Sequence, residues 1–332
     1  MNLAIIGATG NVGRKTIDIL EKSTLSFDNL FLVASKKSAG QNILFKKKKI
    51  QVEDFEFYDF ARAEITFFAA GSLIAKEWAE KASKKTIVID NSSYFRMNEN
   101  VPLVIPEVNP EALRGHKNII ANPNCSTMQM VLVLKPLHDK YKIKRVVVST
   151  YQAVSGAGKD STDELFSQTK EYLMGKKITS KNFTKQIAFN LIPHIDDFGQ
   201  DGYTKEELKM VNETKKILGN KIKLTATCVR VPVLISHCES INIQFENSFS
   251  LDQIYSALSS AKGCKVIDER KNGGYVTPIE AQDQFDTYIS RIRIDSTQKN
   301  CLNMWVVSDN LLKGASLNAV QIAETLVNKN II

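Results

Sequence analysis

The 332-residue sequence lacks any apolar run near the roughly 18 residues that a membrane-spanning helix needs. Residues 3–6 form a short apolar segment, but no basic stretch precedes it as in a secretory signal peptide. The five cysteines are scattered and include no CxxC pair, which argues against a disulfide framework and against a zinc site. We therefore expect a reduced, cytoplasmic protein that binds neither a membrane nor a metal.

The sequence also lacks the features of a nucleic-acid-binding protein, although its net charge is +8. Its densest basic run, residues 46–49, has no interleaved aromatic residues and belongs to no known nucleic-acid motif. A solvated loop or sheet edge explains such a run better than a nucleic-acid partner does. The positive potential can still attract small anions.

The first third of the chain alternates apolar strands with helical segments, which predicts a doubly wound, Rossmann-like α/β domain with a parallel sheet. Strands are expected at residues 3–6, 30–34, 65–70, 86–89 and 118–121, and helices near residues 11–22 and 72–82. The length of the chain indicates a second domain.

The pattern of strands and helices changes after residue 126. Strands expected at residues 143–154, 221–231, 239–245, 287–294 and 301–307 follow one another with few helices between them. This order is typical of an α+β domain with a mostly antiparallel sheet. We assign residues 1–126 to a dinucleotide-binding domain completed by a C-terminal helix in 311–332, and residues 127–310 to a catalytic and dimerisation domain.

Cys125 lies where an apolar strand gives way to an apolar helix, in the run Asn122-Pro123-Asn124-Cys125-Ser126-Thr127. Unpaired N–H groups and the macrodipole at a helix start stabilise a thiolate and lower its pKa. Most free cysteines are instead buried small hydrophobes. The polar neighbours favour a nucleophile over that alternative.

A glycine-rich turn follows the first expected strand and opens the first helix, which is the context that a dinucleotide-binding fingerprint requires. Its spacing is GxxGxxG, and the residues expected to contact the cofactor are Gly7, Thr9, Gly10, Asn11, Val12 and Gly13. The glycines permit close backbone approach, and a pyrophosphate can lie over the N–H groups of the helix start. A purely structural glycine turn is the alternative.

The end of the second strand has no carboxylate to bind a ribose 2′-hydroxyl. The chain has Ser35, Lys36, Lys37 and Ser38 there instead. Two hydroxyls and two cations suit a 2′-phosphate, so we predict NADP(H) in preference to NAD(H). An ordinary basic loop is the alternative.

The nucleotide site, the run Asn124-Cys125-Ser126-Thr127 and a later Arg-Val-Pro-Val-x-x-x-His segment at residues 230–237 are together similar to those of the aspartate-semialdehyde dehydrogenase family, over essentially the full length. The resemblance implies NADPH-dependent reduction of L-aspartyl 4-phosphate to L-aspartate 4-semialdehyde with release of phosphate. In that family the reaction leads to lysine, methionine, threonine and diaminopimelate. It also implies a homodimer or homotetramer built through the second domain.

By the same resemblance, Cys125 is the nucleophile that forms a thioester with the acyl group. His237 is the acid/base residue, because an imidazole titrates near neutrality. A structural role is the alternative for any single histidine, and His237 is one of four. Asn124 and backbone N–H groups near Cys125 are expected to stabilise the oxyanion, a contribution of about 3 kcal/mol per donor.

The resemblance also implies the groups that hold the substrate. Arg230 binds the α-carboxylate, for which its planar fork is suited. Glu206 meets the substrate ammonium, Gln152 orients the substrate, and Arg96 and Lys209 hold the departing phosphate. Solvated surface charges, and an i, i+3 ion pair between Glu206 and Lys209, are the alternatives.

Ser155, Gly156 and Asn310 correspond to family positions near the nicotinamide. The chain departs from the family at Lys37, where arginine is common, and at Cys238, where serine is common. Lysine offers a point charge and no fork, which weakens the 2′-phosphate inference slightly. A thiol at residue 238 would be a second target for oxidation.

Two other functions remain open from the sequence. N-acetyl-glutamyl-phosphate reductase runs the same thioester and hydride chemistry, but Glu206 would then face a blocked amine. The other is a nucleotide-sensing or nucleic-acid-binding protein that keeps the fold without the chemistry. The presence of both Cys125 and His237 argues against it.

Overall fold

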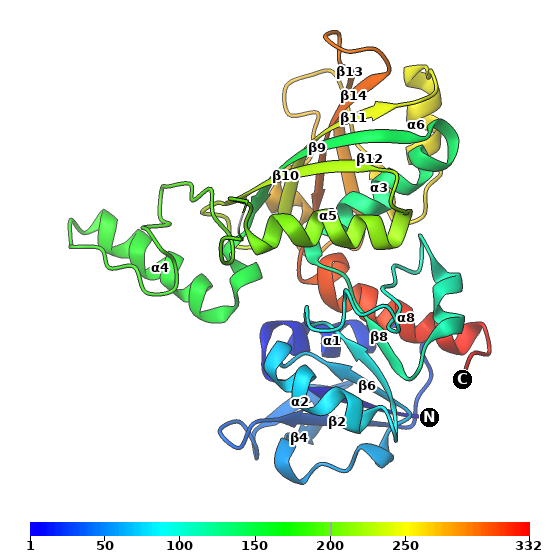
Figure 1. Ribbon diagram of the computed structural model, residues 1–332. Helices are drawn as coiled ribbons and strands as arrows, with labels where there is room; N and C mark the ends of the chain where they lie inside the picture. Colours follow the sequence, from blue (N-terminus) through cyan, green and yellow to red (C-terminus); the bar gives the residue numbers. More distant parts are fainter. Residues whose placement is uncertain (200) are drawn as a thin grey trace. The chain divides into compact units, whose positions relative to one another are not determined.

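The computed structural model describes residues 1–199 and 201–332, which divide into two compact units (Figure 1). One unit contains residues 1–123 and 315–332, and the other contains residues 124–314. The sequence placed these limits at residues 126/127 and 310/311. Residues 124–126 and 311–314 therefore belong to the second unit, so Cys125 shares a unit with Arg230 and His237.

The first unit is built on a parallel sheet of strand order β5-β2-β1-β6-β7-β8. The strands are β1 (Asn2–Ile6), β2 (Asn29–Ala34), β5 (Glu53–Asp54), β6 (Ile65–Phe68), β7 (Ile87–Asp90) and β8 (Ile119–Ala121). Helix α1 (Asn11–Lys22) connects β1 to β2, toward one edge of the sheet. Helix α2 (Ser72–Ala82) connects β6 to β7, toward the other edge. Right-handed crossovers in opposite directions place these helices on opposite faces of the sheet. The predicted doubly wound domain is confirmed.

The C-terminal helix α8 (Leu317–Asn328) completes this unit and packs against α1. Asn318 on α8 donates hydrogen bonds to the carbonyl of Val104 at 2.9 Å and to Oδ1 of Asn122 at 2.6 Å. The end of the chain is thereby fixed beside the end of β8. A π-helical turn, Leu312–Ser316, precedes α8, so the regular helix begins later than the sequence suggested.

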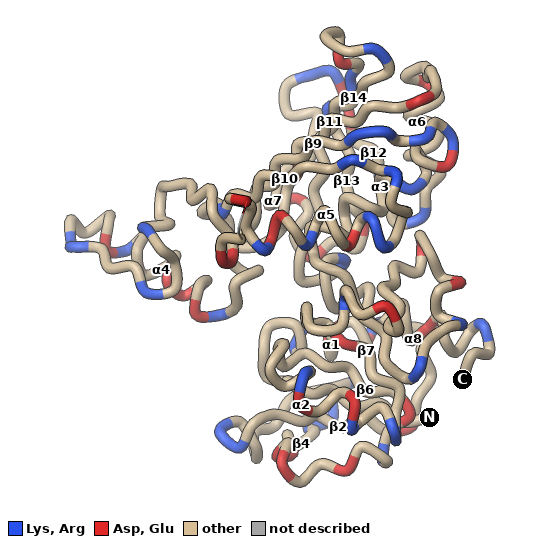
Figure 2. Tube along the Cα trace, in the orientation of Figure 1, with Lys and Arg blue, Asp and Glu red and all other residues tan. Residues whose placement is uncertain are grey.

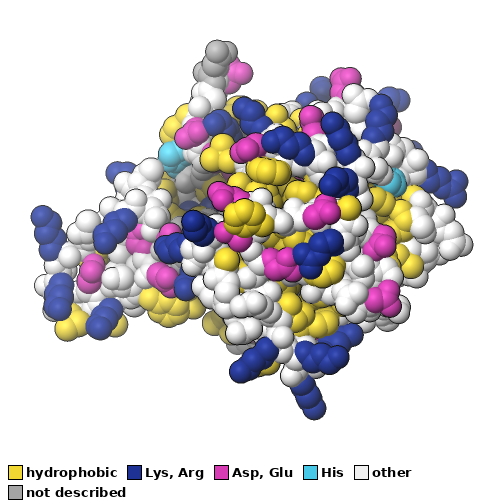
Figure 3. All heavy atoms as spheres, turned by 90° about the horizontal axis from the view of Figure 1, so that it is seen from below, with side chains coloured by type: hydrophobic (Ala, Val, Ile, Leu, Met, Phe, Trp, Pro, Cys, Tyr) yellow, Lys and Arg dark blue, Asp and Glu magenta, His cyan; other side chains and the backbone are white. Residues whose placement is uncertain are grey.

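The basic run at residues 46–49 lies on a hairpin of β3 (Asn42–Phe45) and β4 (Lys48–Gln51). Its two-residue turn places Lys46 and Lys47 at φ 45° and 66°, the left-handed conformation that tight hairpins require. All four lysines are exposed. Cations and anions are interspersed along both units in Figure 2, and across the face drawn in Figure 3. This distribution agrees with the solvated loop or edge expected from the sequence.

The second unit contains a mixed sheet of order β10-β9-β11-β14-β13-β12. The strands are β9 (Ile143–Gln152), β10 (Lys223–Arg230), β11 (His237–Phe245), β12 (Cys264–Val266), β13 (Thr287–Ile294) and β14 (Cys301–Ser308). The central pairs are antiparallel, as predicted, and the two edge pairs are parallel. The parallel edges arise because α5 (Lys205–Leu218) lies between β9 and β10, and α7 (Pro278–Ala281) lies between β12 and β13.

One face of this sheet carries the main core. Alternate residues of β11, Ile241 and Ile243, pack with Met130 and Leu134 of α3 (Cys125–Tyr141). Helices α5 and α6 (Leu251–Ser259) lie on the same face. The arm that carries α4 (Lys159–Leu173) extends away from the sheet (Figure 1) around a small cluster of its own. Among the described residues, no helix is both long enough and apolar enough to cross a membrane.

Candidate active site

Cys125 is the first residue of α3 and is partly exposed. Asn124 is the N-cap, in the extended conformation with φ −63° and ψ 145°. Its Oδ1 accepts hydrogen bonds from the backbone N–H groups of Ser126 at 3.0 Å and Thr127 at 3.1 Å. The N–H groups of Ser126 and Thr127 are therefore occupied by the cap, although the sequence analysis expected N–H groups near Cys125 to bind an oxyanion. The Asn124 Nδ2 amide carries a second hydrogen besides the one that it donates to Glu206, so it remains a candidate.

Helix α5 holds Asn124 by two carboxylates. Glu206 accepts a hydrogen bond from Asn124 Nδ2 at 2.9 Å, and Glu213 accepts one from the Asn124 backbone N–H at 2.6 Å. Seven residues are about two helical turns, so both carboxylates lie on one face of α5. Glu213, which is 1% exposed, was missed in the sequence analysis. Its i, i+7 spacing from Glu206 was the available signal.

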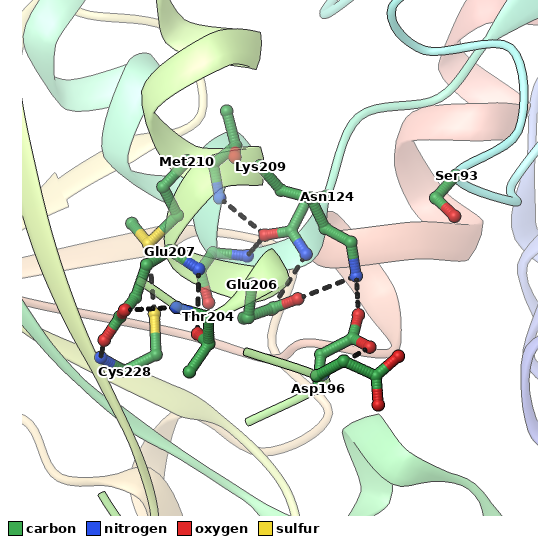
Figure 4. Close-up of polar contacts among 12 residues, drawn as sticks. Ser93, Asn124, Asp196, Thr204, Glu206, Glu207, Lys209, Met210 and Cys228 are labelled. Carbon is green, nitrogen blue, oxygen red and sulfur yellow. Dashed lines mark hydrogen bonds and ion pairs between the residues drawn. The ribbon is translucent and has the colours of Figure 1, made fainter. Parts of the chain in front are cut away.

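Glu206 is a buried carboxylate in a polar cluster (Figure 4). Besides Asn124, it accepts a hydrogen bond from Gln152 Nε2 at 3.1 Å and pairs with Lys209 Nζ at 3.1 Å. Burial opposes its ionisation, but the charge of Lys209 and the hydrogen bonds outweigh it and lower the pKa of Glu206 to about 2. The group therefore stays anionic, as a partner for a cation should.

Lys209 lies between two carboxylates. Its Nζ is 3.1 Å from Glu206 and 2.7 Å from Asp196, which comes from the loop before α5. Burial opposes the charge of Lys209, yet the two anions raise its pKa. The i, i+3 ion pair considered from the sequence is thus present. An ammonium group has three N–H donors, so two carboxylates do not exhaust its capacity to bind an anion.

Arg230 ends β10, beside Gln152 at the end of β9. Its Nη1 donates a hydrogen bond to the carbonyl of Ala153 at 2.7 Å, and the residue is 6% exposed. Burial lowers the pKa of Arg230, while Glu206 and the Cys125 thiolate oppose that shift. The charge of the Arg230 guanidinium therefore interacts with the thiolate of Cys125, the candidate nucleophile.

His237 begins β11 and is fully buried. Its Nδ1 accepts a hydrogen bond from the Ala153 N–H at 3.0 Å, which places the proton of a neutral ring on Nε2. Within the described residues Nε2 has no hydrogen-bond partner. Burial and the Arg230 charge lower the pKa of His237 to about 3, against smaller contributions from Glu206 and the Ser236 backbone. The ring is therefore neutral in this state. The sequence analysis assumed an imidazole that titrates near neutrality, and the burial of His237 opposes that assumption.

Gly156 is in direct proximity to both His237 and Arg230. A Cβ atom at residue 156 would lie 3.1 Å from His237 Nε2 and 3.2 Å from Arg230 Nη1. Gly156 is exposed, whereas its neighbour Ser155 is 5% exposed. A Cβ at residue 156 would therefore crowd the imidazole and guanidinium groups, both of which are buried.

Gln152 and Asn310 are buried, and their amides are bound within the protein. Gln152 Oε1 accepts a hydrogen bond from the Thr150 hydroxyl at 3.0 Å, while its Nε2 binds Glu206. Asn310 Nδ2 donates to Ser155 Oγ at 3.0 Å, and its Oδ1 accepts from the Ser236 N–H at 2.9 Å. The structure brings Cys125, Asn124, Gln152, Ser155, Gly156, Glu206, Lys209, Arg230, His237 and Asn310 into the second unit.

Cys238 lies on the other face of β11 from His237, as successive strand residues do. It is 2% exposed and packs with Val276, Tyr288 and Val307. Burial raises its pKa to about 12. The expectation that this thiol is a second oxidation target is therefore wrong, because oxidation requires an accessible thiolate.

The glycine turn of the first unit lies at the carboxyl edge of its parallel sheet. A Cβ at Gly7 would lie 2.6 Å from the Ala69 carbonyl oxygen, and one at Gly13 would lie 2.2 Å from the Gly7 carbonyl oxygen. Both positions therefore require glycine. Gly10 is exposed and forms the N-cap of α1 without a capping side chain, so the N–H groups of residues 11 and 12 face an approaching anion.

The turn after β2 lies at the same edge, because the Gly7 and Ala8 N–H groups both bond to the Val33 carbonyl. The Ser38 N–H bonds to the Ser35 carbonyl at 2.8 Å and closes this turn. Ser35, Lys36 and Lys37 are exposed. A dinucleotide with its pyrophosphate over α1 would place its ribose near these residues, so the cradle fits a nicotinamide dinucleotide.

Arg96 lies in the first unit, in the loop after β7. It is 8% exposed and donates hydrogen bonds to the carbonyls of Asn122 at 2.9 Å and Asn91 at 3.0 Å. These bonds fix the guanidinium where β7 and β8 end. Ligands of open α/β sheets bind at this edge.

Two family models match most of the chain. The model described as the semialdehyde dehydrogenase NAD binding domain matches residues 2–116, and the one described as the semialdehyde dehydrogenase dimerisation domain matches residues 134–313. Aspartate-semialdehyde dehydrogenase of Aquifex aeolicus is 49% identical over 336 residues, with 99% of each chain covered. That of Rickettsia conorii is 46% identical over 331 residues, with 98% of each chain covered.

Solved structures give the same result. A crystal structure described as aspartate semialdehyde dehydrogenase II of Vibrio cholerae complexed with ASA has a TM-score of 0.96 and 42% identity, with 98% of each chain covered. An aspartate semialdehyde dehydrogenase of Candida albicans with NADP has a TM-score of 0.76 and 26% identity, over 100% of this chain and 99% of that one. The likeness includes both units.

Proposed function

This chain belongs to the aspartate-semialdehyde dehydrogenase family, and we propose that it reduces L-aspartyl 4-phosphate to L-aspartate 4-semialdehyde with NADPH and releases phosphate. The observation that carries the proposal is the position of Cys125 at the start of α3, beside the charged set Glu206, Lys209 and Arg230. That set offers an anion and two cations, which match the ammonium, phosphate and carboxylate groups of the substrate.

In the first step the Cys125 thiolate attacks the acyl carbon. A carbon–sulfur bond forms, the bond from carbon to the phosphate oxygen breaks, and phosphate leaves with that electron pair. Arg230 holds the α-carboxylate and Glu206 the ammonium, while Lys209 and Arg96 hold the phosphate. The Asn124 Nδ2 amide binds the carbonyl oxygen as it gains charge.

We assign proton donation to His237. Its neutral ring carries the proton on Nε2, which lies beside Gly156 and has no hydrogen-bond partner among the described residues. From there it can donate a hydrogen bond to the oxygen or sulfur that carries negative charge during the reaction. Uptake of a proton from the Cys125 thiol at Nε2 requires the other tautomer, so the bond from Ala153 to Nδ1 must break or the ring must turn.

The cofactor is NADP(H). When bound, it supplies the hydride that reduces the thioester. Residues 7–13 hold its pyrophosphate, Ser35, Lys37 and Ser38 bind its 2′-phosphate, and Ser155, Gly156 and Asn310 lie near its nicotinamide. The NADP complex of the Candida albicans relative supports this choice. A tighter Kd for NADH than for NADPH would contradict it.

We further propose a cytoplasmic homodimer or homotetramer that serves lysine and diaminopimelate, threonine and methionine biosynthesis. The match to a dimerisation domain supports the oligomer. N-acetyl-glutamyl-phosphate reductase is the weaker alternative, because the buried anion of Glu206 suits a free ammonium and an acetylated amine does not carry that charge. Turnover of the two semialdehydes, run backward with phosphate and NADP, separates these functions.

The deciding experiment is mass spectrometry after incubation with L-aspartyl 4-phosphate and no reductant. We expect an aspartyl adduct on the peptide that contains Cys125, and release of the adduct as the semialdehyde when NADPH is added. Cys125→Ser is the control and acquires no adduct that NADPH releases. Steady turnover by that variant, or acylation of another residue, would overturn the thioester mechanism.

A further inference from the structure

The segment between β14 and α8 makes a tight turn in the second unit. Asp309 is fully buried, and its Oδ1 accepts hydrogen bonds from the N–H groups of Leu311 at 2.8 Å and Leu312 at 3.1 Å. The Gly314 N–H bonds to the Asp309 carbonyl at 3.2 Å. The π-helical turn Leu312–Ser316 follows. Such π turns are rare and often occur at functional sites.

Gly314, in this turn, touches the nucleophile candidate. A Cβ at residue 314 would lie 2.9 Å from Cys125 Cβ and 3.3 Å from Cys125 Cα. These are not the flexible ends of long side chains, so any side chain at residue 314 must displace the first residue of α3. Gly314 thereby limits the position that the sulfur can take.

Asn310, at the other end of the turn, binds the residue before His237. Its Oδ1 accepts the Ser236 N–H at 2.9 Å, and Ser236 has φ 79°, an unfavourable conformation for a residue with a side chain. Ser236 directly precedes His237. Asn310 also bonds to Ser155, the neighbour of Gly156. Its amide therefore stabilises the backbone from which the imidazole projects.

We propose that residues 310–314 form a spacer that sets the position of Cys125 relative to His237, with Gly314 and Asn310 as positioning residues. This inference rests on the proposed pairing of Cys125 and His237 in the reaction. It gives Asn310 a role besides the cofactor contact expected from the resemblance, because its amide already binds Ser155 and Ser236.

The test compares Gly314→Ala and Asn310→Ala with the wild type. Its readout is the rate of Cys125 alkylation by iodoacetamide across the pH range, which needs neither substrate nor cofactor. Gly115→Ala is the matched control, because a Cβ there has no heavy atom within 4 Å among the described residues. Circular dichroism shows which variants fold, and Asn310→Ala keeps the test valid if Gly314→Ala does not fold.

We expect both variants to change the midpoint of the alkylation profile and to lower kcat about tenfold or more with KM nearly unchanged, since a small misplacement of a reacting group is costly. The Kd of Gly314→Ala for NADPH stays within about threefold of the wild type. A folded variant with an unchanged alkylation profile would overturn the spacer, and so would a loss confined to NADPH binding. Failure of the wild type to turn over the semialdehyde would instead overturn the proposed function and leave the alkylation result intact.

Discussion

At the scale of single residues, Glu206 of the second unit stays ionised although it is buried, where the ionised form is normally disfavoured. Glu206 is 5% exposed, and its ionised form is favoured only because Lys209, Asn124 and Gln152 all point at it. A carboxyl group in that position without those partners would bind a proton. The anion is therefore a property of the cluster and depends on each member.

Replacing Glu206 with glutamine tests this dependence. The pKa of Glu206 is about 2 in the folded chain against 4.5 for an unperturbed glutamate, so the group stabilises the fold above pH 4.5 and loses that contribution as pH falls toward 2. We expect Glu206→Gln to lower the free energy of unfolding by about 1–3 kcal/mol at pH 7 and to flatten its decline between pH 4.5 and 2.

Urea unfolding at several pH values measures both effects. The exposed Glu77, on α2, provides the control, because Glu77→Gln should follow the wild-type curve. Equal pH slopes for Glu206→Gln and the wild type would show that Glu206 does not titrate in this range.

His237 should remain neutral in the protein without substrate. Burial and Arg230 lower its pKa to about 3, from 6.5 for an unperturbed histidine. The unfolded chain therefore binds the extra proton first, and the fold loses stability as pH falls below 6.5. We expect the His237 ring signals in NMR to stay constant between about pH 5 and pH 8, where an ordinary histidine titrates.

The signals can be assigned by their loss in His237→Asn. A titration midpoint near neutrality would contradict the buried, neutral ring. That result would restore the simple acid/base role inferred from the sequence.

Sequence motifs were enough to propose the site residues, but not to predict the contacts between them. The polar run around Cys125 and the glycines after β1 are local patterns, so the sequence alone exposes them. Glu213 binds Asn124, which is 89 residues earlier in the chain. Gly314 contacts Cys125, which is 189 residues earlier (314 − 125). Such contacts depend on tertiary packing, which leaves little local signal. The burial that lowers the pKa of His237 is hidden for the same reason.

At the scale of elements, the turn between β1 and α1 uses its glycines for different purposes. Gly7 and Gly13 leave no room for a Cβ atom, whereas at Gly10 the nearest atom to a Cβ would be 3.5 Å away, an ordinary contact. Gly7 lets the turn approach the backbone that follows β6, and Gly13 lets α1 approach the backbone of the turn itself. The third is exposed and leaves space for a ligand.

We expect Gly13→Ala to destabilise the fold by about 1–3 kcal/mol, since the new methyl group forces α1 away from the backbone of the turn. Gly10→Ala is the matched control in the same turn and should unfold close to the wild-type temperature. Differential scanning calorimetry compares the two variants. Equal losses of Tm would mean that the turn adapts to either methyl group.

Most elements were predictable because each has a clear period. Helices α1 and α2 have the bounds that the sequence predicted. The hairpin of β3 and β4 and the short helix α6 were missed, since a lysine-rich turn and a nine-residue helix give weak patterns. The parallel edges of the second sheet were missed because strand order is decided by packing over long distances.

At the scale of the whole molecule, the family resemblance is confirmed over nearly the full length of the chain. The second unit also has a sheet face that its large helices do not cover. Ser240 on β11 lies opposite Trp305 on β14 on this face, and both line a hollow of about 350 Å³. Exposed apolar residues, including Ile279 and Ile294, occur in the adjoining elements. A dimerisation domain with such a face is suited to a second copy.

We expect the wild type to be at least a dimer by light scattering, and Ser240→Arg to shift it toward the monomer. A long cation on this face would require an unpaired charge to be buried between the copies. Ser26→Arg, an exposed serine of the first unit, is the matched control and should leave the mass unchanged. A monomeric wild type would reject the oligomer, and an unchanged mass for Ser240→Arg would place the interface elsewhere.

The paired carboxylates of α5 have a consequence for how this chain tolerates insertions and deletions. Glu206 and Glu213 are separated by about 10 Å of rigid helix, and both bind the residue before the sulfur. One residue added between them would rotate the second carboxylate by about 100° and leave a single attachment. The stretch between them should therefore keep a constant length in any working variant, while the exposed hairpin turn at Lys46 and Lys47 can lengthen freely.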